Sequence, residues 1–70
     1  MGEVPLARMW QLPDGTCCVL LKDSSADNWL LRVVRSDRTL QTEHFDSPIV
    51  AMEHARLWRA SYEPTVEVSG

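Results

Sequence analysis

The cysteines and histidines are the side chains best suited to metal binding or nucleophilic chemistry, and their spacing favours neither. Cys17 and Cys18 are adjacent, so in a strand they point to opposite faces and cannot readily form a disulfide with each other. A zinc site needs three or four Cys or His ligands at defined spacings. The histidines, His44 and His54, stand far from the cysteine pair in sequence. We therefore expect one cysteine in the core, one at the surface, and no metal or cofactor.

Catalytic motifs are missing from the sequence. It contains no nucleophile elbow, no glycine-rich phosphate loop and no HExxH pattern, and two of its three glycines stand near the ends, at Gly2 and Gly70. A chain this short can hardly form a deep pocket of roughly a few hundred Å³ by itself. We predict that the protein is not an enzyme. Redox or metal chemistry at Cys17 or Cys18 is the weakest of the functions considered.

Arginine and tryptophan carry the remaining binding chemistry. Arginines that flank a tryptophan on a sheet are typical of single-stranded nucleic-acid binders, because bases stack on the ring and phosphates meet the guanidinium groups. Against this, the chain has 7 Lys and Arg but 10 Asp and Glu, whereas duplex-DNA binders usually show a basic excess. The alternative is that these arginines surround a protein interface. The candidate nucleic-acid or partner-binding residues are Arg8, Trp10, Arg32, Arg35 and Arg38.

The elements that would position these residues are four strands and a helix. Strands are expected at 6–12, 16–22, 29–35 and 38–45, because these segments are rich in β-prone residues and are separated by turn-forming ones. Pro13, Asp14 and Gly15 are strong turn chemistry, and Ser36-Asp37 is a two-residue hairpin turn without the usual Asn-Gly. The fold class is therefore α+β, a four-stranded antiparallel sheet of two hairpins followed by one helix packed on one face.

The helix has the clearest signals. Asp46 or Ser47 can cap it, and Pro48 suits the first helical position. Ala51, Ala55, Trp58 and Tyr62 recur at helical spacing and form its inward stripe. Residues 1–5 are expected to be a flexible start, 6–62 a single domain, and 63–70 a tail that follows Pro64. The predicted core comprises Trp29, Leu31, Val33, Leu40, Trp58 and Ala55.

Both faces of the predicted sheet are half apolar, although one helix can cover only one of them. A two-residue turn at 36–37 would pair Val33 with Leu40, on the helix-facing side, and Val34 with Thr39, on the other. If the first hairpin places Arg8 and Trp10 on the uncovered side, an apolar patch results, and such patches mark interaction surfaces. We therefore expect self-association as a homodimer. The residues assigned to this patch are Trp10, Leu20, Leu30 and Val34, of which Leu20, Leu30 and Val34 form the self-association face.

Composition fits one small globular domain. Seventy residues are too few for two domains, and the hydrophobic fraction of 44% is that of an ordinary globular chain. No secretory signal and no apolar run of about 20 residues, as a membrane helix needs, is visible. With no disulfide framework either, we expect a cytoplasmic protein without a membrane partner.

Four strands followed by a helix over residues 6–62 resemble the unit of Whirly and positive-cofactor-four type proteins. That resemblance, which is one of topology, implies a curved sheet that oligomerises and binds single-stranded DNA. Residues 28–60, with Trp29, Phe45-Asp46-Ser47 and Ala51, are also similar to the arm-binding domain of phage integrases. The basic residues that this family uses on its strands are represented in part, by Arg32, Arg35 and Arg38.

Two functions follow as hypotheses. The first is a non-enzymatic binding module that self-associates and, like a transcription cofactor, contacts single-stranded nucleic acid. The second is a protein–protein adaptor or subunit in which the same face meets a protein and nucleic acid plays no part.

Overall fold

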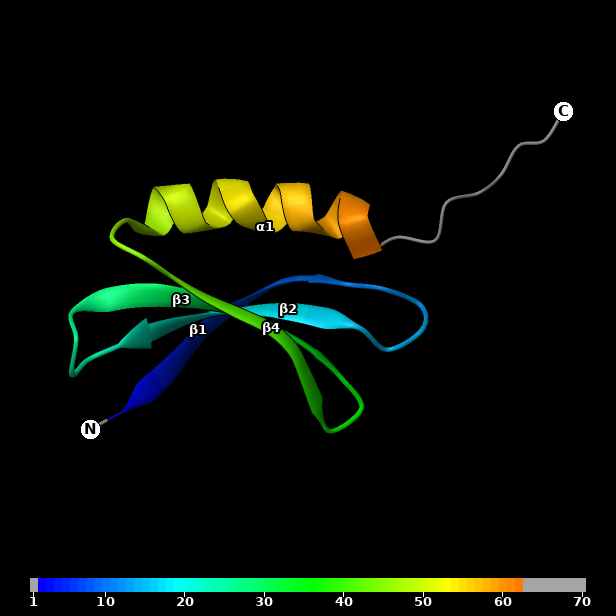
Figure 1. The fold of residues 1–70 in the computed structure, drawn as a ribbon, viewed down its shortest axis with the longest axis horizontal. Helices are drawn as coiled ribbons and strands as arrows, with labels where there is room; N and C mark the ends of the chain where they lie inside the picture. Colours follow the sequence, from blue (N-terminus) through cyan, green and yellow to red (C-terminus); the bar gives the residue numbers. More distant parts are fainter. Residues whose placement is uncertain (1, 63–70) are drawn as a thin grey trace, which may run out of the picture.

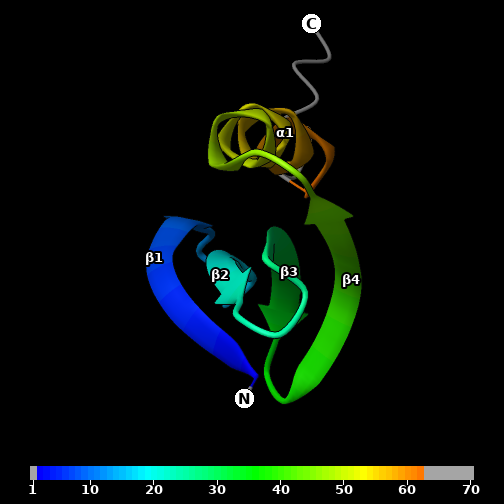
Figure 2. The same cartoon turned by 90° about the vertical axis from the view of Figure 1, so that its left-hand side faces the viewer.

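The structure, a computed structural model, describes residues 2–62. One antiparallel sheet, with strand order β1-β2-β3-β4, precedes a single helix. The elements are β1 (Glu3–Gln11), β2 (Cys17–Asp23), β3 (Asn28–Arg35), β4 (Arg38–Phe45) and α1 (Pro48–Tyr62). Figure 1 shows α1 lying along one face of the sheet, and Figure 2 shows β1 and β4 flanking β2 and β3 and curving toward each other on the side away from α1. The α+β prediction is confirmed, and the expected tail at 63–70 lies outside the described residues.

The first turn forms as its residues predict. The Asp14 carboxylate accepts a hydrogen bond from the backbone N–H of Thr16 at 2.9 Å, and Gly15 takes a positive φ of 94°, which glycine adopts without steric cost. The N–H of Leu12 donates to the carbonyl of Thr16 at 2.7 Å. The side-chain and backbone bonds together close the hairpin between β1 and β2.

The first strand is longer than expected. β1 begins at Glu3, three residues before the predicted start of the strand at residue 6. Glu3 and Pro5 are poor strand formers, but β1 is an edge strand, where a proline can be accommodated because one side of the strand needs no donor. Pro5 pairs with Leu21 of β2.

The second hairpin departs from the expected register. Arg35 lies opposite Arg38, as a two-residue turn requires, but a β-bulge between Val33 and Val34 shifts the pairing. Val33 therefore pairs with Gln41 rather than with Leu40. The extra residue on β4 is Leu40, whose side chain packs against the helix-side core. A bulge places two residues opposite one and re-aims the side chains beyond it.

The helix begins where its capping residues predict. The Ser47 hydroxyl accepts hydrogen bonds from the backbone N–H groups of Ile49 and Val50, at 3.2 and 3.5 Å. These bonds satisfy two of the donors that the first turn of a helix leaves free. Pro48 is the first residue of α1. The small residues Ala51 and Ala55 are buried and let the helix lie close to the sheet.

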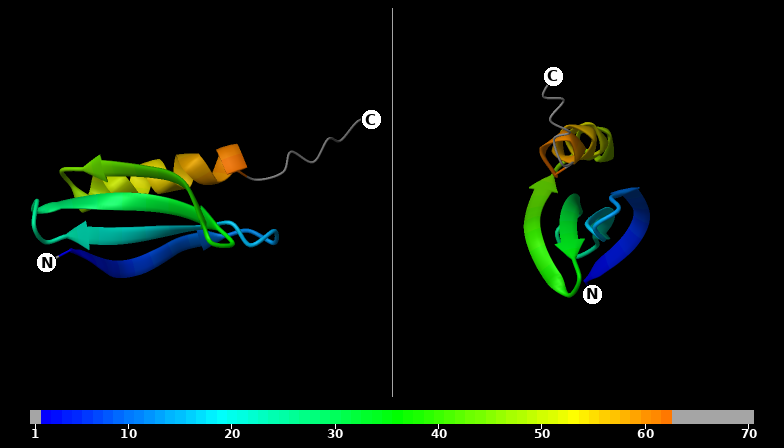
Figure 3. Two further views of the ribbon diagram at one scale, coloured as in Figure 1. Left: turned by 60° about the horizontal axis from the view of Figure 1, so that its bottom comes forward. Right: turned by 90° about the vertical axis from the view of Figure 1, so that its right-hand side faces the viewer.

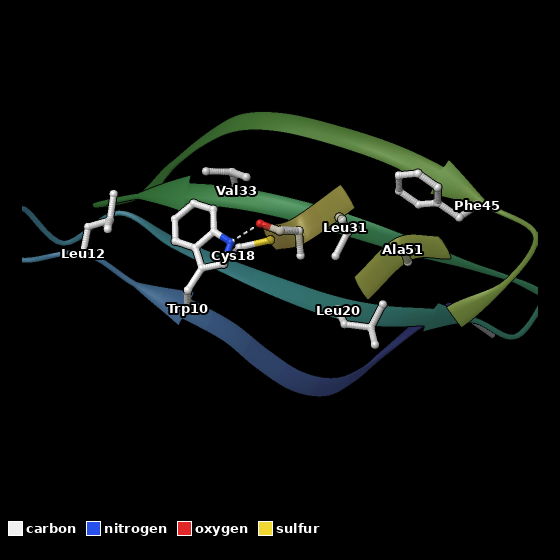
Figure 4. Close-up of a cluster of buried hydrophobic side chains, with 9 residues drawn as sticks. Trp10, Leu12, Cys18, Leu20, Leu31, Val33, Phe45 and Ala51 are labelled. Atoms are coloured by element: carbon white, nitrogen blue, oxygen red, sulfur yellow. Dashed lines mark hydrogen bonds between the residues drawn. The ribbon is translucent and has the colours of Figure 1, made fainter. Parts of the chain in front are cut away.

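One hydrophobic core lies between the sheet and α1 (Figure 4). Of the predicted core, Leu31, Val33 and Ala55 are buried, while Trp29, Leu40 and Trp58 are partly buried against it. Apolar side chains from every strand meet the helix there. The cluster consists of Trp10, Leu12, Cys18, Leu20, Leu31, Val33, Phe45, Ala51 and Ala55.

The predicted assignment of Trp10 and Leu20 to the uncovered side is wrong. Cys18 and Leu20, which share the face of Trp10, pair with Val33 and Leu31 of β3. All three side chains therefore lie on the face of the sheet that meets α1. The sequence contains no signal for this pairing between hairpins, and a slip of one residue exchanges the two faces of a strand. Trp10 and Leu20 are only 8% and 5% exposed.

Candidate binding surface

Within residues 2–62, no helix or second sheet covers the face of the sheet opposite α1, which is here called the open face (Figure 3). Its side chains form rows across the strands, set by the backbone pairing. One row runs Arg8, Val19, Arg32, Thr42, and the next runs Gln11, Cys17, Val34, Thr39. The half-buried Cys17, Val19 and Val34 occupy the middle of these rows, and exposed polar residues occupy both ends.

Arg8 and Arg32 lie in the same row, on either side of Val19. Arg8 and Trp10 were expected on the same face, but a register irregularity between these residues turns Arg8 to the open face and Trp10 to the helix side. Arg8 is exposed and donates a hydrogen bond to the Gln11 side chain at 2.6 Å. Arg32 forms an ion pair with Glu3, with a nitrogen–oxygen distance of 2.9 Å. The Glu3 carboxylate therefore neutralises the charge of Arg32, whereas Arg8 bonds to a neutral amide.

Arg35 and Arg38 are directly opposite each other beside the β3–β4 turn. The Asp14 carboxylate, from the β1–β2 turn, approaches the Arg35 guanidinium at 3.7 Å. Both partners are half exposed, and an exposed pair of this kind contributes little to stability. The turn-end arginines therefore form a site separate from the Arg8–Arg32 row, and the structure does not bring all four arginines together.

Trp10 is a core residue rather than a stacking platform. Its indole N–H donates a buried hydrogen bond of 2.7 Å to the carbonyl oxygen of Ala55 (Figure 4). Its ring lies 6.0 Å from that of Tyr62. The chain's other aromatic residues, Trp29, Phe45, Trp58 and Tyr62, also belong to the helix-side core or pack against it. The Trp, Tyr and Phe rings that could stack on a nucleobase are therefore all on the other side of the sheet.

The apolar part of the open face is more protected than expected. Leu30 and Val34 do lie on this face, but Leu30 is fully buried and Val34 is half-buried. Leu21 of β2, which pairs with Leu30, is 6% exposed. The expectation of a broad exposed patch is therefore wrong at Leu30, which the protein's own chain covers. What remains accessible is a small apolar centre of Cys17, Val19 and Val34.

Three turn carboxylates have lowered pKa values. The Thr16 backbone N–H lowers the pKa of Asp14, with a smaller contribution from Arg35. The Ser25 hydroxyl lowers the pKa of Asp23, and the hydrogen bond from Lys22 lowers that of Asp27. Hydrogen bonds to the charged form favour it. These carboxylates therefore stabilise turns, and each has a partner that accounts for its shift.

The cysteines take the expected places. Cys18 is buried and Cys17 is half-buried, both as free thiols. Burial raises the pKa of Cys18 to about 12, so its thiolate, which is the nucleophilic form, is scarce at neutral pH. Within residues 2–62, no group of three or more His, Cys, Asp or Glu side chains could hold a metal ion. The same part of the chain contains no helix that is both long and apolar enough to cross a membrane.

A second exposed feature is the outer surface of α1, which sequence reasoning did not treat as a site. It carries the most exposed large apolar side chains of the described chain, Ile49 and Leu57, at 68% and 67% exposure. Val50 and Met52 are also exposed. The signal was present in the helical spacing, since these residues fall outside the Ala51–Ala55–Trp58–Tyr62 stripe.

Comparison with known proteins adds no assignment: no family model, no curated protein and no solved structure matches this chain. The chain's own geometry is therefore the basis for the function proposed below.

Proposed function

We propose that this chain is a small non-enzymatic binding module whose open face binds a protein partner. The observation that carries the proposal is the composition of that face, an apolar centre of Val19 and Val34 with Arg8 and Gln11 at one border. Protein interfaces commonly combine an apolar centre with a polar rim, and arginine is enriched in them. The two unpaired thiols suit a reducing compartment such as the cytoplasm.

The charge and the aromatic residues favour a protein over nucleic acid. Glu3 already neutralises Arg32, and the chain carries a net charge of -3. Single-strand platforms combine a basic groove with exposed aromatic rings, whereas the rings here pack on the helix side. Nucleic acid stays a second candidate because Arg8 and Arg32 share one row of the open face.

Two binding experiments separate these candidates. The first follows the amide spectrum of the labelled protein during titration with a short single-stranded oligonucleotide at low salt. We expect no saturable shifts. Shifts centred on Arg8 and Arg32 that weaken steeply with salt would establish nucleic-acid binding instead.

The second experiment compares capture of proteins from cells that express the gene, using wild type, Arg8→Glu and Glu53→Arg. Arg8 lies on the open face and Glu53 on the outer side of α1, and both are exposed, so the variants are matched in charge reversal. We expect a captured protein that Arg8→Glu loses and Glu53→Arg retains. The opposite pattern would reject the open face as the binding surface.

A further inference from the structure

The two edge strands of the sheet differ in their readiness to accept another strand. β1 contains Pro5 and two register irregularities, one after Pro5 and one after Arg8. Proline and bulges are common ways of protecting an edge, because they remove a donor and disturb the regular backbone row. β4 contains no proline and a single bulge, at Leu40, and it pairs regularly with β3 from Gln41 to Phe45. The β4 edge is therefore the better template for a further strand.

The charges along β4 suit pairing with a second copy of itself. Arg38 begins the strand, Glu43 lies in its second half and Asp46 follows it. Antiparallel self-pairing sets the beginning of one strand against the end of the other. If Thr42 faces Thr42 of the second copy, Gln41 lies opposite Glu43, and Arg38 comes near Asp46. A register centred on Glu43 would instead oppose two carboxylates, which is unfavourable.

The hydrogen bond that the Gln41 side chain already accepts is compatible with this arrangement. The Tyr62 hydroxyl donates a hydrogen bond of 2.8 Å to the Gln41 amide oxygen. This bond leaves the amide nitrogen, which carries two donors, to bond elsewhere. In the register centred on Thr42, the group opposite Gln41 is the carboxylate of Glu43 from the second copy, which is an acceptor.

The helix supplies a second, independent feature beside the same edge. The His54 ring packs against the ring of Phe45, the last residue of β4, with centroids 4.8 Å apart. Val50 and Leu57 stand four residues before and three residues after His54, so they share its side of the helix. They are 42% and 67% exposed. A strand added beyond β4 would extend the sheet beneath these two side chains.

We propose that β4 is a dimerisation edge, at which two copies of this chain pair antiparallel about Thr42. The two sheets then become one continuous sheet, with both α1 helices on one side and both open faces on the other. This inference goes beyond the proposed function because it uses the edge of the sheet and not its open face. Self-association would then involve the exposed backbone edge of β4 and not the side chains of Leu20 and Leu30, which are buried.

Sedimentation of the full chain over a wide concentration series tests the edge. The matched variants are Thr42→Lys and Leu6→Lys, which place the same charge at exposed positions on opposite edge strands. We expect a reversible wild-type dimer, weakened about fivefold by Thr42→Lys because two like charges meet at the centre, and unchanged by Leu6→Lys. A wild type that stays monomeric, or a dimer that Leu6→Lys dissociates and Thr42→Lys does not, overturns the proposal.

Disulfide trapping tests the register. In a Cys17→Ser background, Thr42→Cys should cross-link rapidly under mild oxidation, because residue 42 faces its own copy. Glu43→Cys should cross-link poorly, since a two-residue offset separates the two Cα atoms by about 8 Å, beyond the roughly 7 Å limit for a disulfide. Faster cross-linking at position 43 would reject this register. Arg8→Glu should leave the dimer intact, so failure of the open-face proposal is distinguishable from failure of this one.

Discussion

Replacing Trp10 with phenylalanine tests whether this ring is a structural residue. The substitution removes the hydrogen bond to Ala55, worth about 1 kcal/mol. It also removes about 40 Å² of buried ring surface, worth about 1 kcal/mol at about 25 cal/mol per Å². The two losses sum to about 2 kcal/mol in the free energy of unfolding. For a domain of this size, this corresponds to a fall of about 8–16 °C in Tm.

Urea unfolding followed by circular dichroism measures this change, and Trp29→Phe provides the control. Trp29 is half-buried and its ring lies under the Lys22 ammonium, 4.1 Å from the ring centroid. This contact survives replacement by another aromatic ring. We expect Trp29→Phe to cost about half as much as Trp10→Phe. A change at Trp10 below about 0.5 kcal/mol, smaller than any single lost hydrogen bond predicts, would refute the assignment of Trp10 to the core.

Three further outcomes follow from the local structure. Ser47→Ala should lower the free energy of unfolding by about 1 kcal/mol, because it removes the cap of α1; denaturant titration measures this, and an unchanged midpoint would contradict the cap. Asp14, Asp23 and Asp27 have lower pKa values in the folded protein than their ordinary value of 3.8, so their ionised forms stabilise the fold above pH 3.8. The free energy of unfolding should therefore fall as the pH drops below 3.8 and these carboxylates become protonated. Thermal melts that do not change below pH 3.8 would contradict this sign. Alkylation of the native protein should modify Cys17 before Cys18, whose pKa is about 12. The free energy of unfolding should decline as the pH rises from 9.0 toward 12, because the buried thiol resists ionisation in the folded protein. Equal reaction rates for the two thiols would contradict the burial of Cys18.

Local chemistry was sufficient to predict the elements of this fold. Pro13-Asp14-Gly15 specifies the first turn, the Ser47-Pro48 pair specifies the helix start, and the Ala51–Ala55 spacing specifies its buried side. Each of these signals acts over a few residues, so the surrounding fold does not change its meaning. The extension of β1 to Glu3 could not be predicted in this way, because it depends on pairing with β2 rather than on strand propensity.

The candidate site was predicted less well, because faces depend on register across the whole sheet. The irregularity between Arg8 and Trp10 and the bulge beside Val33 each reverse the alternation of side chains beyond them. The pairing of β2 with β3 has no short-range signal at all. As a result, Arg8 and Arg32 were correctly grouped, while Trp10 and Leu20 were assigned to the wrong face. The burial of Leu30 follows from the shape of the sheet, which no local pattern specifies.

Photo-cross-linking inside the producing cell tests the open face most directly. A photoreactive amino acid at Gln11, on the open face, is compared with one at Glu53, on the outer side of α1. Our account predicts a protein adduct from position 11 and none of comparable yield from position 53. An adduct formed from position 53 alone, or a nucleic-acid adduct from position 11, would contradict it.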